Sequence, residues 1–153
     1  MKIYVDADGV PGRDAIVKCA QYYGVSVILV ADVSHPMLPR RGEDLLLVDK
    51  EMDSSDFAIT NLVKAGDLVI TQDMGLAALV LGKGANVVTP RGTLVTNNTI
   101  DHRLAARWVT RKMRAGRERI KGPKPFSKRD HERFLSMLNH CISQAMELPH
   151  EVE

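Results

Sequence analysis

VSVILVA, residues 25–31, is a nearly continuous apolar run without the alternation of a half-exposed strand. A strand that is buried on both faces has this pattern, and such strands occur in parallel sheets. Shorter apolar runs recur at residues 2–5, 45–48, 67–71 and 86–89. Because the segments between most of these runs have helical character, strands and helices alternate, which predicts a parallel sheet with helices on both faces.

Start and stop residues delimit the predicted helices. Pro11 suits the first turn of a helix that runs to about Tyr23, and Gly24 ends it. Further helices are predicted at about 54–64 and 75–81, and residues 92–95 are a candidate hairpin arm. Two more complete the chain, one at about 98–115 and one at about 127–148, which begins with a capping box at Ser127–Asp130.

The predicted fold is therefore a three-layer α/β domain with a parallel sheet of about five strands and two C-terminal helices. The chain has 153 residues, a length that fits one domain, which we expect to span residues 1–150. Cys19 and Cys141 lie in predicted helices without a nearby ligand partner, so both are expected to be reduced and buried. With no signal peptide and no membrane-spanning run, the expected location is the cytoplasm, and no membrane partner is expected.

Charge is distributed unevenly along the chain. Residues 1–101 carry nine Lys/Arg against 13 Asp/Glu, a balance of −4, and residues 102–153 carry twelve against six, a balance of +6. An acidic front half followed by a basic segment suggests a metal site beside an anion-binding surface. A solvated helix face explains the basic segment equally well.

Several aspartates follow the predicted strands. Asp6 and Asp8 end the first strand and Asp73 ends the fourth. If the strand order is 3-2-1-4-5, these carboxylates share the crevice where the order reverses, which is where open α/β sheets bind ligands. Asp53 and Asp56 open the helix after the third strand and would reach the rim of this crevice. Asp53 is equally suited to capping that helix, and a turn before Gly9 is the less favoured alternative for Asp8.

Clustered carboxylates repel one another, and a divalent cation removes that repulsion. Mg²⁺ is typically held by one or two carboxylates together with waters and substrate phosphate. We therefore predict that Mg²⁺ or Mn²⁺ binds at Asp6, Asp8 and Asp73, with Asp53 at the rim.

Four arginines lie on one side of the helix predicted at about 98–115. Arg103, Arg107, Arg111 and Arg114 are spaced four, four and three residues apart and fall within roughly an 80° arc. Guanidinium groups can grip phosphate in bidentate fashion, so the stripe predicts nucleic-acid binding. Little aromatic surface accompanies these cations, and Trp108 has the place of a core residue, so base stacking is not evident from the sequence.

A set of motifs in fixed order resembles the YaiI/YqxD family of bacterial proteins, over about residues 1–140. The motifs are Asp6-Ala7-Asp8 with Pro11, Asp53-Ser54-Ser55-Asp56, Gly66 to Asp73, Lys83-Gly84-Ala85, Pro90-Arg91-Gly92, Arg107 and Gly122 to Phe126. The fold of this family is similar to the PIN-like nucleases, in which acidic residues after the first and fourth strands hold Mg²⁺ or Mn²⁺. The resemblance implies such roles for Asp6, Asp8, Asp53, Asp56 and Asp73.

The chain departs from the family pattern at two places. Asp8-Gly9-Val10-Pro11-Gly12-Arg13 stands where the family usually has Asp-Ala-Cys-Pro-Val-Lys, so a thiol there is not needed, and Arg13 keeps the charge of the usual lysine. Gly75 replaces a usual proline. The carboxylates are intact.

Three functions are compatible with these residues. The first is a metal-dependent nuclease acting on RNA, or less favourably DNA, with catalytic Asp6, Asp8, Asp56 and Asp73; Asp8 or Asp56 would orient the attacking water. The second is a phosphatase of the haloacid dehalogenase kind, with Asp6 as nucleophile and Lys83 as its electrostatic partner. The third is a nucleic-acid-binding protein without turnover. The sequence leaves the oligomeric state open.

Overall fold

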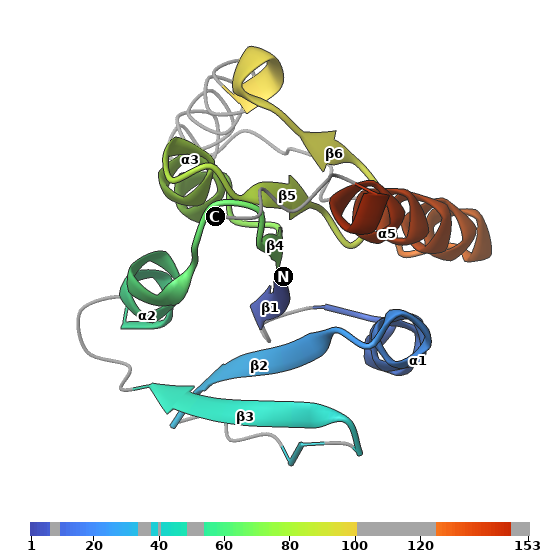
Figure 1. Ribbon diagram of the computed structural model, residues 1–153, viewed down its shortest axis with the longest axis horizontal. Coiled ribbons are helices and arrows are strands. Elements are labelled where there is room, and N and C mark those ends of the chain that lie inside the picture. The colour runs from blue at the N-terminus through green and yellow to red at the C-terminus, as the bar shows by residue number, and fades with distance from the viewer. Residues whose placement is uncertain (7–9, 34–37, 40, 49–53, 101–124, 148–153) are drawn as a thin grey trace, which may run out of the picture.

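A computed structural model describes residues 1–6, 10–33, 38–39, 41–48, 54–100 and 125–147, and for residues 54–57 it describes the backbone alone. These residues form a central sheet covered by helices (Figure 1). The elements are β1 (Lys2–Asp6), α1 (Arg13–Tyr23), β2 (Ser26–Asp32), β3 (Glu43–Val48), α2 (Ser54–Leu62), β4 (Leu68–Ile70), α3 (Met74–Gly82), β5 (Asn86–Val88), β6 (Leu94–Val95) and α5 (Lys128–Glu147).

The strand order in the sheet is β3-β2-β1-β4-β5-β6. Strands β1 to β5 are parallel and β6 is antiparallel to β5, which confirms the α/β class. The first five strands have the order that was assumed from the sequence for the aspartate site. The sheet has six strands rather than five because residues 94–95 pair with residues 87–88 as the expected hairpin arm.

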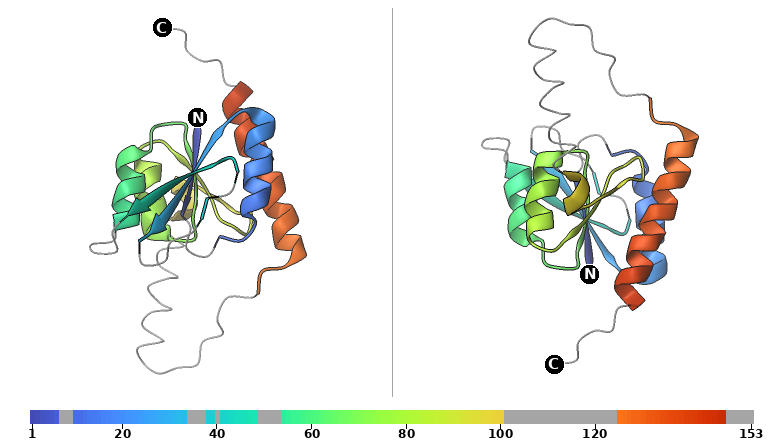
Figure 2. Two further views of the ribbon diagram at one scale, coloured as in Figure 1. Left: turned by 90° about the horizontal axis from the view of Figure 1, so that it is seen from below. Right: turned by 90° about the horizontal axis from the view of Figure 1, so that it is seen from above.

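Helices cover both faces of the sheet, giving three layers. Helices α1 and α5 lie side by side on one face, and α2 and α3 cover the other (Figure 2). Within β1, Ile3 and Val5 belong to the core under α1 and α5, whereas Tyr4 belongs to the core under α2 and α3. Burial on both faces explains why the central strands are apolar at nearly every position.

The helix boundaries follow the predicted signals with small shifts. Helix α1 begins at Arg13 rather than at Pro11, because Gly12 takes a left-handed conformation with φ of 85° and is the N-cap. At the start of α5, the Ser127 amide donates to Asp130 Oδ2 (3.0 Å) and the Asp130 amide donates to Ser127 Oγ (3.1 Å), which is the predicted capping box. Of the helix predicted at about 98–115, residues 97–100 are helical and the rest lies outside the described residues.

Both cysteines are free and buried, as expected from the sequence. Burial raises the pKa of the Cys19 and Cys141 thiols, so both are protonated at neutral pH. Within the described part of the chain, no helix combines the length and the apolarity needed to cross a bilayer.

Candidate metal centre at the carboxyl edge of the sheet

Asp6 and Asp73 lie beyond the carboxyl ends of two neighbouring strands. Strand β1 pairs with β4 in register, with Val5 opposite Ile70. Asp6 is therefore level with Thr71, two residues before Asp73. Strands β2 and β3 lie on one side of β1, and strands β4 to β6 lie on its other side. The strand order therefore reverses between β1 and β4. The two aspartates thus flank the topological switch point, where ligands of open α/β sheets bind.

Thr71 connects the two aspartates. Its Oγ1 donates to Asp6 Oδ2 at 2.9 Å and accepts from the Asp73 backbone N–H at 3.0 Å. The Thr71 side chain is fully buried. Because a hydroxyl has one proton, this geometry commits it to the Asp6 carboxylate and orients that group. Thr71 was not among the residues predicted from the sequence, although a polar residue that ends an apolar strand two positions before an aspartate is recognisable there.

Asp73 is also the N-cap of α3, a role that was not predicted from the sequence. Its Oδ1 accepts from the amides of Gly75 (2.8 Å) and Leu76 (3.3 Å). The amides at a helix start carry partial positive charge, which stabilises a carboxylate held there. Asp73 is therefore fixed in position by the first turn of α3, while Asp6 is fixed by its strand and by Thr71.

The other predicted ligands and contacts fall outside what the structure describes. This holds for Asp8, Asp53, Arg103, Arg107, Arg111 and Arg114, and for the side chain of Asp56, whose backbone lies in α2. Among the described residues, no three His, Cys, Asp or Glu side chains come close enough to form a metal cluster. Of the predicted aspartates that are described, Asp6 and Asp73 are brought to one place.

Lys83, the cation of the phosphatase alternative, lies at the opposite end of the sheet. Helix α3 starts at the carboxyl edge, next to Asp73, and runs back to Lys83, which is its C-cap. There the Lys83 ammonium donates to the carbonyl of Thr60. Nine residues of α-helix extend about 13 Å, so the phosphatase alternative loses the electrostatic partner that the sequence offered it.

Other motif residues have structural partners. Arg13 is buried and makes a bidentate ion pair with Glu43 of β3, with N–O distances of 2.6 and 3.1 Å. Asp67 accepts from the amides of Lys2 and Lys64, both at 2.9 Å, and so joins β1, β4 and the end of α2. The charge that Arg13 shares with the usual lysine therefore serves to hold α1 on β3.

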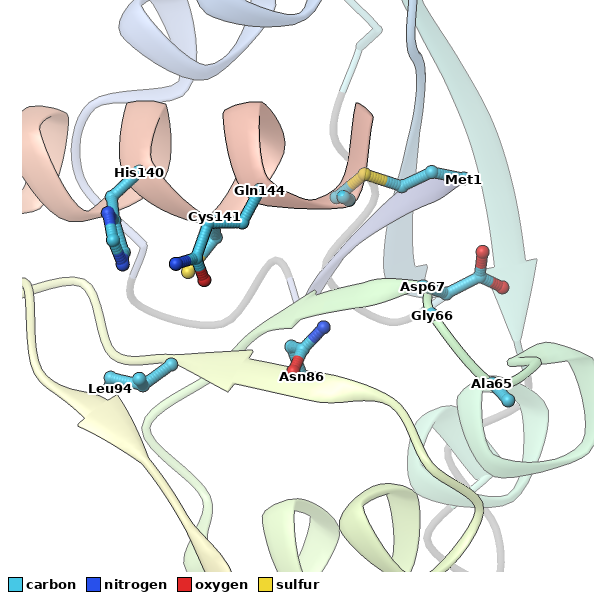
Figure 3. A pocket seen from close by; sticks show the side chains of 10 residues that line it. Met1, Ala65, Gly66, Asp67, Asn86, Leu94, His140, Cys141 and Gln144 are labelled. Carbon is cyan, nitrogen blue, oxygen red and sulfur yellow. The ribbon is translucent and has the colours of Figure 1, made fainter. Parts of the chain in front are cut away.

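A cavity of about 360 Å³ opens at the amino edge of the sheet, away from Asp6 and Asp73. The side chains of Cys141 and Gln144 project from α5 toward Asn86 of β5, with Asp67 to one side (Figure 3). Neither Asp6 nor Asp73 lines it. Its buried carboxylate, Asp67, is already bonded to two backbone amides.

The fold and this edge define the protein as a three-layer α/β domain with paired aspartates at its topological switch point. Residues 4–144 match the model of the uncharacterised YaiI/YqxD family, and the chain belongs to that family.

Its relatives are similar over nearly their whole length. A UPF0178 protein of Bacillus cytotoxicus is 44% identical over 142 residues, which are 93% of each chain. One from Alkaliphilus metalliredigens is 40% identical over 94% of this chain and 93% of its own, and one from Enterococcus faecalis is 38% identical over 95% and 100%. Among solved structures, a mutant of Rae1 (YacP) from Bacillus subtilis aligns with a TM-score of 0.44 and 18% identity over 95% of this chain and 99% of that chain.

Proposed function

We propose that the protein is a divalent-metal-dependent nuclease of the PIN-like kind, acting on RNA in preference to DNA. The observation that carries the proposal is the linkage of Asp6 and Asp73 through Thr71 at the switch point of the sheet. Two carboxylates with fixed positions at a ligand-binding edge are a common minimum for holding a hard cation together with a phosphate.

The donors that are present fit such a cation. Mg²⁺ and Mn²⁺ prefer carboxylate oxygens, and Asp6 and Asp73 supply two carboxylates from rigid elements. Asp8 and Asp53 are the proposed further ligands. When bound, the cation would supply Lewis-acid stabilisation of negative charge on the phosphate.

The remaining tasks belong to side chains of the chain itself. Thr71 orients Asp6, and the first turn of α3 orients Asp73. Arg103, Arg107, Arg111 and Arg114 are the proposed phosphate contacts, because guanidinium groups bind phosphate in bidentate fashion. Asp8 or Asp56 is the proposed residue that orients the attacking water.

Hydrolysis of single-stranded RNA tests the proposal directly. We expect cleavage to require Mn²⁺ or Mg²⁺ and to stop when a chelator is added. Should highly purified protein cleave neither RNA nor DNA with either metal, the nuclease proposal is wrong, and binding without turnover takes its place.

Mn²⁺ is expected to raise the melting temperature. At 100 times the dissociation constant, binding adds about 2.7 kcal/mol, or roughly 5–10 °C for a chain of this length. Asp6→Asn should lose most of this shift, because an amide is a weaker ligand than a carboxylate. Asp44→Asn, an exposed position at the start of β3, is the matched control and should keep it. A melting temperature and calorimetric heat that saturating Mn²⁺ leaves unchanged would rule out the metal site.

Thr71→Val is expected to weaken Mn²⁺ binding by about 10- to 100-fold, the usual effect of losing a residue that orients a ligand. The substitution keeps the shape of the side chain but removes the hydroxyl between Asp6 and the Asp73 amide. Thr71→Ser keeps the hydroxyl and should retain most of the affinity. Isothermal titration of both variants with Mn²⁺ measures the difference, and equal affinities would show that Thr71 has no orienting role.

A further inference from the structure

An exposed aromatic ring stands immediately before α5. Phe126 keeps 37% of its surface exposed, and its ring meets that of His131 edge to face, with centroids 6.2 Å apart and planes at 74°. Edge-to-face contacts are a favoured geometry for aromatic pairs, so the contact with His131 favours this orientation of the Phe126 ring. A ring held in this way offers a π face to a planar group.

Cationic residues cluster at the start of α5, where this pair also lies. Lys128 and Arg129 are exposed in the first turn of α5, and Arg133 follows one turn later. Arg91 donates from Nη1 to Asp130 Oδ2 at 2.9 Å. Counting Arg91 and residues 126–133, four Lys/Arg stand against Asp130 and Glu132, a balance of +2.

Asp130 is engaged locally. Hydrogen bonds from the Ser127 amide and hydroxyl lower the pKa of the Asp130 carboxyl, and the charges of Arg91 and Arg133 lower it further. The Asp130 carboxylate therefore accepts hydrogen bonds from the Ser127 amide and from Arg91. The net charge of Arg91 and residues 126–133 remains positive.

The aromatic pair lies at the same carboxyl edge of the sheet as Asp6 and Asp73. Arg91 comes shortly after the carboxyl end of β5, and the His131 ring covers Gly12, at whose position a β-carbon would lie 3.5 Å from the ring. Gly12 is the last residue of the segment that connects the end of β1, at Asp6, to the start of α1. Strands β1 and β5 are the two neighbours of β4, so they are about 10 Å apart.

We propose that Phe126, Lys128, Arg129 and His131, here named the Phe126 platform, bind single-stranded nucleic acid, with a base stacked on Phe126 and phosphates held by the cations. Single strands favour this arrangement because their bases are free to stack on aromatic rings, and stacking combined with cationic contacts is the usual means of binding them. The proposal rests on the proposed function in that it names the strand-binding surface beside the same centre.

Binding is measured without divalent metal, in excess chelator, with a fluorescein-labelled single-stranded oligouridine by fluorescence anisotropy. Phe126→Leu removes the aromatic face but keeps an apolar side chain, and we expect affinity to fall by about 5- to 150-fold. Phe126→Trp keeps a stacking face and should bind like the wild type. Tyr22→Ala, which removes an 83%-exposed ring near the far end of α1, is the matched control and should bind normally.

The cations are tested through salt dependence. Lys128→Ala with Arg129→Ala should lower the slope of log affinity against log salt by about 1.4 units, since each phosphate contact on a single strand contributes about 0.7. Lys64→Ala, an exposed lysine just before β4 at the amino edge, should leave the slope unchanged.

The outcomes separate this proposal from the nuclease itself. Affinity that is the same in Phe126→Leu, Tyr22→Ala and wild type would overturn the platform, even if the protein cleaves RNA. A selective loss in Phe126→Leu with recovery in Phe126→Trp would support the platform, even if no metal supports cleavage. Far-UV circular dichroism establishes that each variant is folded.

Discussion

Asp73→Asn is expected to lower the rate of Mn²⁺-dependent RNA cleavage by at least about 100-fold while leaving the fold intact. Stabilisation of charge by a bound metal contributes several kcal/mol to the transition state, and each 1.36 kcal/mol is tenfold in rate. Asn is as good an N-cap as Asp, so the bonds from the Gly75 and Leu76 amides have a replacement acceptor. The substitution therefore separates the two roles of Asp73.

The measurement is single-turnover cleavage of a labelled single-stranded RNA. Asp6→Asn should show a similar loss, and Asp44→Asn, purified identically, should match the wild type. Because a trace contaminating nuclease would cleave in every preparation, activity has to disappear in both site variants. Melting temperatures without metal establish that the proteins are folded. Full activity in a folded Asp73→Asn protein would exclude Asp73 from the catalytic centre.

Gly92→Ala is expected to destabilise the protein by about 2–5 kcal/mol. Gly92 has φ of 86°, and a β-carbon there would lie 2.5 Å from the carbonyl carbon of Arg133 and 2.6 Å from the backbone nitrogen of Phe134. Left-handed backbone costs about 1–2 kcal/mol in an L-residue, and forcing an added carbon into close packing costs about 1–3 kcal/mol more. Because Phe134 is fully buried, α5 has to move for the new carbon to fit.

Gly66→Ala is the matched control for this contact. Gly66 has φ of 88°, but a β-carbon there meets no atom within 4 Å. Gly66→Ala should therefore lower the free energy of unfolding only by the cost of a left-handed backbone, about 1–2 kcal/mol. Urea unfolding measures the loss of stability in both variants. The difference between the two losses is the cost of fitting a β-carbon between α5 and the turn before β6. Equal losses of stability in the two variants would show that a β-carbon at residue 92 is accommodated without strain against α5.

The sequence by itself was sufficient for the α/β class, whereas the order of the first five strands was an assumption that the structure bears out. Strand and helix signals are local properties. The apolar run at residues 25–31 is short, rich in valine and preceded by Gly24, which favours a buried parallel strand over a buried helix. The placement of Asp6 and Asp73 at one edge followed from the strand order alone. Capping chemistry is equally local, so the Ser127 and Asp130 bonds that start α5 were also predictable.

Contacts between residues far apart in the chain were decided by the tertiary structure alone. The Thr71 bond to Asp6 spans 65 residues and the Arg13 pair with Glu43 spans 30, and no local pattern specifies such pairings. The same holds for Lys83, whose distance from Asp6 depends on the direction in which α3 runs.

The Phe126 platform shows the same division. In the sequence, Phe126 is one aromatic residue beside a basic segment, and stacking was not evident. Only the packing of α5 on the sheet brings His131 over Gly12 and Arg91 against Asp130, and so places the start of α5 at the carboxyl edge of the sheet. Composition and periodicity thus determine which elements form, because those depend on neighbours in the chain. The surroundings of each side chain depend on how those elements pack, and that is settled by contacts between distant segments.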